Sequence, residues 1–284
     1  MTEPDLVIGS LIATPQVRQA CGQWLQDGRY ALQPLPLGGE GWHERIVAAW
    51  DGLDGLLIEQ NALEPGLLDQ LRQEGLLPTV VIGAVTGELT CHEAEVHLQA
   101  DQLEQLPYVL DAAVSRFLER RVLRGEAREG TAPEQWRLSR RLEDRLGYLG
   151  VFYKRDPALF LRHLPAAEQA DLLRSLERSY RDVLLSYFRD PPAANQAIES
   201  YVNTAFFSDL PITRTVEIHM NLIDGWSKQL RLEGHKSDFL QDYRLALLDV
   251  MAHLCEMYRR SIPPEVGAGP SRLPARHRRQ EETP

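Results

Sequence analysis

The C-terminal half of the chain is organised around one stretch, residues 235–262, with the sequence HKSDFLQDYRLALLDVMAHLCEMYRRSI. Apolar residues recur there at steps of three and four, a spacing that predicts a helix with one buried stripe. This stripe comprises Leu240, Tyr243, Leu247, Val250, Met251, Leu254 and Tyr258. A second apolar set widens it and comprises Phe239, Leu248, Cys255 and Ile262. We therefore expect two buried faces, one in its own bundle and one against a second bundle, a subunit or a partner peptide; a central helix of a monomeric core is the alternative.

Three further helices with short connections precede this stretch. We predict them at residues 166–188, 196–208 and 212–232, with turns at 190–194, 209–211 and 233–235. Together with residues 236–262 they predict an all-α unit, a C-terminal four-helix bundle at residues 165–263. Residues 264–284 are rich in Gly, Pro and Arg, which predicts a disordered tail.

Strand and helix alternate in the N-terminal half. The predicted strands are residues 5–13, 30–35, 55–59, 78–82 and 95–98, and the predicted helices are 15–28, 40–50, 67–74 and 103–123. This alternation predicts an α/β domain at residues 1–124, a parallel sheet of the flavodoxin-like type. Residues 83–93 hold too few apolar positions for a covering helix, so we expect the fourth helix to be reduced to a loop. The side chains expected to point inward from helix 40–50 are Trp42, Ile46, Val47 and Trp50.

Response-regulator receivers share this type of fold, but their chemistry is missing here. A receiver needs an acceptor Asp at the end of its third strand, an acidic pair after the first strand and a Lys after the fifth. In this chain the third strand ends in Glu59, no carboxylate follows the first strand, and the first half contains no lysine. The domain is therefore predicted to be a pseudo-receiver without phosphotransfer activity. Glu59 either mimics a charged acceptor or is an exposed residue at a strand end.

The two halves are joined by residues 125–164, which we interpret as a linker with a helix and a short strand. Residues 125–133 are small, charged and turn-rich, and residues 134–146 predict a helix. The segment GYLGVFYKRD (147–156) alternates like a strand. A lone strand leaves backbone donors and acceptors without partners, so we expect it to add to a sheet edge, in this chain or across a dimer, or to another protein. Asp156 is expected to cap the next helix.

Composition restricts the classes of function. The net charge is −10, from 41 acidic and 31 basic residues, which argues against nucleic-acid binding. No apolar run approaches the roughly 20 residues needed to span a bilayer, and the N-terminus lacks a secretion signal. The three cysteines, Cys21, Cys91 and Cys255, are scattered, which argues for a reducing compartment and against a zinc site. We expect a cytoplasmic protein without membrane contact.

No cluster in the sequence predicts a catalytic or metal site. His92, Glu93, Glu95 and His97 do not share one face of a strand, and we interpret them as a solvated strand edge. His253 lies in the wide apolar helix, where a core or interface histidine and a polar anchor for a bound peptide are the two interpretations. Arg231 either caps its helix or meets a carboxylate of a partner.

Four segments in order carry a resemblance to a known family: LEQLPYVLDAAVSRFL, RLGYLGVFYKRDP, AFFSDLPITRTVEIHM and AHLCEMYRRSIP. They resemble the KaiA family of cyanobacterial circadian-clock proteins, densely from residue 138 to 263 and more loosely from the N-terminus to residue 123. The resemblance implies a non-enzymatic homodimer, joined through the C-terminal helical domain. It implies binding of the C-terminal tail of the kinase KaiC, stimulation of KaiC autophosphorylation, and sequestration by KaiB bound to KaiC.

The resemblance also places sites on this chain. For the KaiC tail it suggests polar anchors beside an apolar floor, with the residues Asp224, Arg231, His253, Leu254, Glu256 and Met257. For the KaiB–KaiC complex it points to the linker strand, with the residues Leu149, Val151, Phe152 and Lys154. The family's pseudo-receiver is linked to oxidised quinone as an input; no other cofactor is implied.

Two functions of other classes remain as alternatives. One is a receiver-type signalling output protein acting through the helical domain, which the missing acceptor chemistry opposes. The other is a ligand-sensing module, in which Trp24, Trp42 and Trp50 line a hydrophobic pocket for a quinone.

Overall fold

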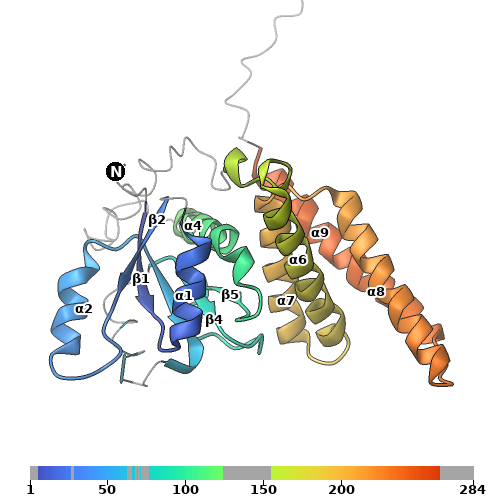
Figure 1. Cartoon of the computed structure of the whole chain (residues 1–284), viewed down its shortest axis with the longest axis horizontal. Helices are drawn as coiled ribbons and strands as arrows, with labels where there is room; N and C mark the ends of the chain where they lie inside the picture. The colour runs from blue at the N-terminus through green and yellow to red at the C-terminus, as the bar shows by residue number, and fades with distance from the viewer. Residues whose placement is uncertain are drawn as a thin grey trace, which may run out of the picture.

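The computed structural model describes residues 6–26, 29–62, 66, 67, 69, 71, 77–123 and 155–262, with side chains included except at residues 120–123. The predicted division into an α/β half and an all-α half is confirmed (Figure 1). We call residues 6–123 the sheet half and residues 155–262 the helical half. The predicted linker helix and most of the linker strand lie outside the described residues, as does the tail from residue 263.

Five parallel strands form one sheet in the order β2-β1-β3-β4-β5. They are β1 (Leu6–Leu11), β2 (Tyr30–Pro34), β3 (Gly55–Glu59), β4 (Thr79–Ile82) and β5 (Val96–Leu98). This is the predicted flavodoxin-like order. The central strands are apolar and buried along nearly their whole length because helices cover both faces of such a sheet.

The helices of the sheet half follow the expected positions. They are α1 (Pro15–Trp24), α2 (Trp42–Trp50), the 3₁₀ turns η1 (Gln60–Ala62) and η2 (Leu103–Gln105), and α4 (Leu106–Leu123). The described residues of the expected third helix, 67, 69 and 71, are helical, and so is residue 66 before it. The inward placement of Val47 was wrong, because α2 buries Ile46 and leaves Val47 exposed.

The chain between β4 and β5 contains no helix, as predicted, but the solvated edge expected there was wrong. Glu95 and His97 are buried, with 2% and 4% of their surfaces exposed. The Glu95 carboxylate accepts backbone N–H groups of Thr90, Cys91 and His92, at 2.6, 2.6 and 3.1 Å, and His97 Nε2 at 2.8 Å. A buried carboxylate must find hydrogen-bond donors, and here the backbone of the β4–β5 loop supplies them. These bonds fix the conformation of the loop that replaces the fourth helix.

Helix α4 is buried on almost its whole circumference, from Leu106 to Leu118. It packs against β4 and β5 on one side and against α7 of the helical half on the other. The two halves therefore share one continuous apolar core rather than two separate cores. Figure 1 shows α4 between the strands and the olive helices α6 and α7.

The helical half contains two 3₁₀ turns, η3 (Pro157–Leu159) and η4 (Leu161–His163), and then α6 (Ala166–Ser186), α7 (Pro191–Phe207), α8 (Ile212–Leu232), η5 (Asp238–Tyr243) and α9 (Arg244–Arg260). The prediction for α8 is confirmed at both ends. Asp156 caps as expected, accepting the Ala158 N–H at 2.9 Å, although it begins a 3₁₀ turn rather than an α-helix.

Two predicted boundaries in this half were wrong. Residues 190–194 are not a turn: α7 begins at Pro191, because Asp190 caps it by accepting the Ala193 N–H and a proline fits the first helical position. The helix expected from residue 236 is split, with 3₁₀ geometry up to Tyr243. That geometry places the Tyr243 ring against Phe188 and Trp226, with ring centroids 5.1 and 6.0 Å away.

Candidate partner-binding surface

Helix α8 packs on the bundle most closely through its first half, while Leu222, Ile223 and Trp226 further along are only partly buried against it. Its buried residues are Thr215, Ile218 and His219, all in the first half of its 21 residues. In Figure 1 its second half reaches beyond the other helices. A long amphipathic helix with so little covered surface in one chain indicates that something else covers the rest.

The attachment of α8 is polar and aromatic. The Tyr180 hydroxyl lies 3.1 Å from His219 Nδ1, and the Tyr201 hydroxyl donates to Thr215 Oγ1 at 2.9 Å. The Tyr180 and Tyr201 rings pack edge to face at 4.9 Å. Burial lowers the pKa of His219 below its ordinary value, so the neutral imidazole is favoured.

Apolar side chains form an exposed stripe on both α8 and α9. On α8 they are Ile212, Val216 and Met220, spaced by four residues, and Met220 is 57% exposed. On α9 the exposed stripe comprises Leu245, Leu248, Ala252 and Cys255, spaced by three, four and three residues. Such spacing is typical of helix-to-helix pairing. We call these seven residues the α8–α9 surface. It contains Leu248 and Cys255 of the second apolar set, and the other two members, Phe239 and Ile262, are exposed as well, so that set is uncovered in a single chain.

An aromatic cluster closes the end of the bundle where α8 turns into η5. Phe188 packs edge to face on Tyr187 and Tyr243, and Trp226 of α8 packs on Tyr243. Phe188 is half exposed. The cluster thus extends the apolar region from α6 to α8.

The predicted tail-binding residues lie on both helices, and their polar members are accessible. Asp224 and Arg231 are exposed on α8, and Asp224 pairs with Lys228 at 2.6 Å. His253 is exposed on α9, its Nδ1 2.9 Å from the Asp249 carbonyl oxygen, so the core interpretation of His253 was wrong. Leu254 and Met257 are buried within the single chain and belong to the bundle core.

Glu256 lies at the far end of the same helix. Hydrogen bonds from Arg259, and then from Arg260, lower the pKa of Glu256 to about 2. Arg231 lies in the last turn of α8, and Glu256 lies twelve residues, about 18 Å, from the start of α9, where it pairs with Arg259 and Arg260 of its own helix. One chain therefore does not bring Arg231 and Glu256 together into one cluster.

The predicted linker-strand residues Leu149, Val151, Phe152 and Lys154 lie outside the described residues, which resume at Arg155. The Arg155 guanidinium is enclosed by the rings of Phe160, Phe206 and Tyr258, at 5.2, 4.9 and 5.2 Å. It also pairs with Asp209 at 2.7 Å. The linker therefore ends in a firm anchor on the helical half.

The next residue contacts the sheet half. Asp156 pairs with Arg29 at 3.0 Å, and Arg29 pairs with the buried Asp111 at 2.9 Å. Two consecutive residues thus attach the end of the linker to both halves. The sequence gives no local signal for this, since the partners lie far apart along the chain.

Glu59 lies at the end of β3, where a receiver has its acceptor Asp, and its carboxylate is already hydrogen-bonded. Glu59 accepts the backbone N–H groups of Ala13 and Thr14, each at 2.8 Å, and the Thr14 hydroxyl at 2.5 Å. Burial acts to raise the pKa of Glu59, but these hydrogen bonds outweigh it and hold the pKa below its ordinary value. Glu59 ties β3 to the start of α1, so the exposed strand-end interpretation was wrong.

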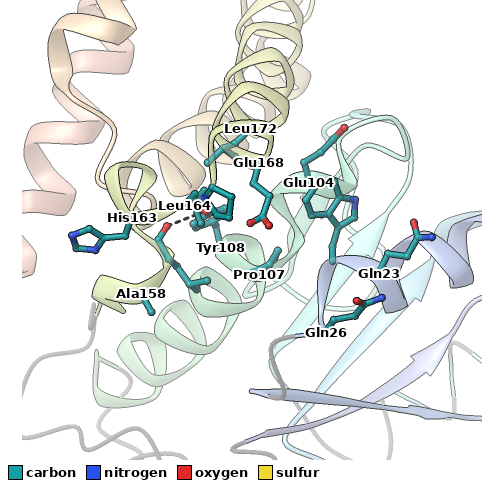
Figure 2. A pocket seen from close by; sticks show the side chains of 13 residues that line it. Gln23, Gln26, Glu104, Pro107, Tyr108, Ala158, His163, Leu164, Glu168 and Leu172 are labelled. Carbon is teal, nitrogen blue, oxygen red and sulfur yellow. Dashed lines mark hydrogen bonds between the residues drawn. The ribbon is translucent and has the colours of Figure 1, made fainter.

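A cavity of about 500 Å³ lies between α1, α4, η3–η4 and α6. In Figure 2 the side chains of Gln23 and Gln26 face those of Glu168 and Leu172 across it. Trp24 and Tyr108 line it as well, whereas Trp42 and Trp50 do not. The expected pocket of three tryptophans is therefore not formed at this cavity.

Sequence reasoning missed several residues of the surface. Met220 and Val216 carry a signal, since they continue a four-residue spacing from Ile212. Asp249 and Tyr187, which lie beside the surface, carry none: they are 62 residues apart in the sequence and meet only in the fold, where burial together with Asp249 raises the pKa of Tyr187.

None of the described helices combines the length and apolar character needed to cross a membrane. Among the residues that the structure describes, no group of three or more His, Cys, Asp or Glu side chains is placed to hold a metal ion.

Comparison with known proteins places both halves in one family. Residues 6–121 match the family described as circadian clock protein KaiA, N-terminal domain, and residues 144–265 match the KaiA C-terminal domain. The circadian clock oscillator protein KaiA of Parasynechococcus marenigrum (strain WH8102) is 53% identical over 290 residues, covering 100% of this chain and 98% of the relative. That of Synechococcus elongatus is 43% identical over 274 residues, covering 89% of this chain and 96% of the relative.

Among solved structures, the chain is similar to the crystal structure of the C-terminal domain of KaiA from Thermosynechococcus elongatus BP-1. The sequence identity is 47%, 37% of this chain and 100% of that chain are covered, and the TM-score is 0.33.

Proposed function

The chain belongs to the KaiA family of circadian clock proteins, and on that premise we propose that it binds the C-terminal tail of the kinase KaiC as a homodimer and stimulates KaiC autophosphorylation. In this proposal it acts by binding rather than by catalysis, in the cytoplasm. A partner shifts a kinase between states only by its differential affinity for those states. A difference of a few kcal/mol changes the occupancy of a state about a hundredfold or more.

The uncovered α8–α9 surface is the observation that supports this proposal. Its spacing of three, four and three on α9 suits pairing with the same helix of a second copy. A dimer formed there leaves a groove beside the paired helices, where a peptide contacts apolar side chains and the exposed polar residues Asp224, Arg231 and His253. In a dimer, residues that lie far apart in one chain can approach each other across the twofold axis.

Self-association is tested with the variants Met220→Glu and Leu248→Glu in the full chain. Each places a charge on the α8–α9 surface, and each should shift the mass in solution from dimer toward monomer at micromolar concentration without loss of helical circular dichroism. Leu89→Glu is the matched control, because Leu89 lies in the β4–β5 loop with a similar exposure of 55%. Unchanged mass for both surface variants would contradict the proposed interface.

Tail binding is tested by titrating the full chain with a synthetic KaiC C-terminal tail. We expect one tail per subunit, with affinity reduced at least about tenfold by charge reversal at Arg231 and at Glu256. Glu256 already pairs with Arg259 and Arg260, so a smaller loss there than at Arg231 is expected. If a folded dimer carrying both reversals bound the tail as tightly as the unaltered chain, this site would be abandoned.

We further propose that KaiB bound to KaiC sequesters the chain through the linker strand. The support is the firm anchor that follows this strand, at Arg155 and Asp156, because a fixed end reduces the entropy lost on binding. Phe152→Ala and Lys154→Ala should weaken capture by a preformed KaiB–KaiC complex and leave tail affinity unchanged. Equal loss of both affinities would argue for a general folding defect instead.

The cavity beside Trp24 favours a second candidate function, binding of oxidised quinone as an input. It is the right size for a small aromatic ligand, and its lining mixes apolar side chains with Gln23 and Gln26. Quenching of tryptophan fluorescence by a soluble oxidised quinone should disappear in Trp24→Phe and persist in Trp42→Phe. Quenching that followed Trp42 would move the site away from this cavity.

The structure does not favour the receiver-type alternative. The carboxylate nearest the acceptor position, Glu59, is bonded to Ala13 and Thr14. Incubation with a small phosphodonor should therefore give no gain in mass.

A further inference from the structure

Three glutamines of the sheet half occur at three-residue spacing, Gln99, Gln102 and Gln105, and all three reach into the helical half. Facing them on α6 are Ser175, Ser179 and Asp182, whose spacing of four and three places them on one side of that helix. Both patterns are visible in the sequence, but only the fold brings them together. We call these six residues, with Thr204 of α7, the polar seam.

The hydrogen bonds of the seam are continuous. Gln105 Nε2 donates to Ser175 Oγ and Ser179 Oγ, at 2.9 and 2.6 Å, and Gln105 Oε1 accepts the Thr204 hydroxyl at 2.7 Å. Ser179 Oγ also donates to Gln102 Oε1 at 2.8 Å. Gln102 and Gln99 both donate to Asp182 Oδ2, at 2.8 and 2.6 Å.

The central residues of the seam are removed from water. Gln105, Ser175 and Thr204 are fully buried, and 2% of Gln102 and of Ser179 is exposed. A buried polar group that loses its partner is costly, whereas the same group in water finds another. If the two halves packed in another arrangement, these polar groups would be buried without partners. The seam therefore selects one arrangement of the halves, although it adds little to the free energy that holds them together.

The helices that carry the seam also hold α8. On α6, Ser179 faces the glutamines and the next residue, Tyr180, contacts His219. On α7, Thr204 bonds Gln105, and one turn earlier Tyr201 donates to Thr215. Both hydrogen-bonded attachments of α8 thus lie within one turn of a seam residue.

We propose that the polar seam couples the two halves: it fixes one docked orientation of the sheet half on α6 and α7, and its release changes how α8 is held on the bundle. The inference deepens the proposed function, since α8 carries part of the surface assigned there to the tail and the second copy. It also gives the sheet half a route of influence that needs no phosphotransfer.

One backbone amide reports directly on docking. The Gly87 N–H, in the β4–β5 loop, donates to Gln196 Oε1 of α7 at 2.9 Å. In the same loop the amides of Thr90, Cys91 and His92 donate to Glu95 within the sheet half. Undocking exposes Gly87 alone, whereas unfolding of the sheet half exposes all four amides.

The experiment is amide exchange followed by NMR on the full chain with Gln105→Leu and, as a milder variant, Ser179→Ala. We expect exchange at Gly87 to accelerate roughly ten- to a hundredfold, because several hydrogen bonds of the seam are lost. Thr90, Cys91 and His92 should keep their rates. Gln169→Leu is the matched control, because the Gln169 amide donates to Leu164 O at 2.8 Å within the helical half.

The second readout is the NMR signal of the His219 imidazole, which a purely local role of the seam would leave unchanged. We expect its chemical shift and its titration midpoint to move in both seam variants and to stay in the control. An unchanged Gly87 rate, equal acceleration of all four loop amides, or an unchanged His219 signal would each overturn the proposal.

Tail affinity is measured in the same variants and separates the two proposals. If the unaltered chain does not bind the KaiC tail, the proposed function fails, while Gly87 and His219 still decide whether the seam couples the halves. If the tail binds and Gly87 does not respond, the proposed function stands and the seam proposal fails.

Discussion

The substitution Glu95→Gln tests the largest difference between the sequence-based expectation and the structure. Glu95 was expected at a solvated edge, where loss of its charge changes stability by at most about 0.5 kcal/mol. In the structure 2% of Glu95 is exposed, and its carboxylate accepts three backbone N–H groups and His97 Nε2. The two views therefore predict very different free energies of unfolding.

The expected loss follows from these four hydrogen bonds. Bonds to a charged group contribute about 1.5–3 kcal/mol each, and a glutamine keeps one acceptor oxygen while its NH₂ group faces donors. We expect the free energy of unfolding of the sheet half to fall by about 3–5 kcal/mol, and the midpoint temperature to fall by roughly 10 °C. Urea unfolding at pH 7, followed by circular dichroism, measures it.

The pH dependence of this stabilisation is a second test, and its direction follows from the pKa of Glu95. Burial acts to raise the pKa of Glu95, but hydrogen bonds from His97, Thr90 and Cys91 outweigh it and hold the pKa below its ordinary value of 4.5. The unfolded chain therefore binds more protons between the two values. The stabilisation is complete above pH about 4.5 and is lost as the pH falls through the folded-state pKa, so the two proteins should converge in acid.

Glu88→Gln is the control, because Glu88 is an exposed carboxylate in the same loop. It should stay within about 0.5 kcal/mol of the unaltered chain. If Glu95→Gln lowered the free energy of unfolding by less than about 1 kcal/mol at pH 7, or if its effect did not shrink in acid, Glu95 would not be the buried acceptor that holds the β4–β5 loop.

Three further predictions concern the attachment of the elements. Burial lowers the pKa of His219, so its contribution to stability is complete above pH about 6.5 and is lost as the pH falls below it; His219→Leu should flatten the slope of unfolding free energy between pH 5 and 7. Arg155→Ala should lower the free energy of unfolding in urea by about 2–3 kcal/mol, because an enclosed and paired guanidinium is lost. Arg162 contacts the same ring of Phe160 but is exposed, so Arg162→Ala should lower it by less than about 1 kcal/mol. Gly87 has φ 76°, and a Cβ there meets the backbone of Pro192, so Gly87→Ala should lower the midpoint temperature and accelerate amide exchange along the β4–β5 loop; unchanged values would show that the loop does not pack on α7 as described.

Helix α8 and strand β3 show where local pattern is sufficient. Both were predicted with their observed bounds, because the pattern of apolar residues and, for α8, the preceding Pro211 act within or next to the segment itself. The strand order follows equally well, since alternating strands and helices leave few ways to build a parallel sheet. The uncovered second stripe of α9 was also foreseen, as an excess of apolar positions.

Residues 236–243 and 190–194 show where local pattern fails. The first was expected to be α-helical, but tertiary contacts of Tyr243 with Phe188 and Trp226 accompany a 3₁₀ segment. In the second, the two prolines suggested a turn although they fit the first turn of α7. In both places the local signal allows two conformations.

For the candidate site, too, some properties follow from the sequence and others from the packing of the helices. Asp224, Arg231, His253 and Glu256 were chosen from the family resemblance, and their exposure is a matter of helix position that periodicity predicts in outline. That Leu254 and Met257 are core residues of the single chain depends on how α9 packs on α7, which the sequence does not show.

The sequence by itself determined the two fold classes, the order of the sheet, the absence of a receiver's Asp and Lys from their usual positions, and the family, because each depends on residue types and on spacing within short segments. Only the tertiary structure decided the burial of Glu95 and His97, the role of α4 as a helix shared by both halves, the cage around Arg155 and the seam of Gln99, Gln102 and Gln105. A polar side chain becomes buried only when distant segments supply its hydrogen bonds. Local periodicity indicates which face of an element is apolar, but it does not name the element that will cover that face.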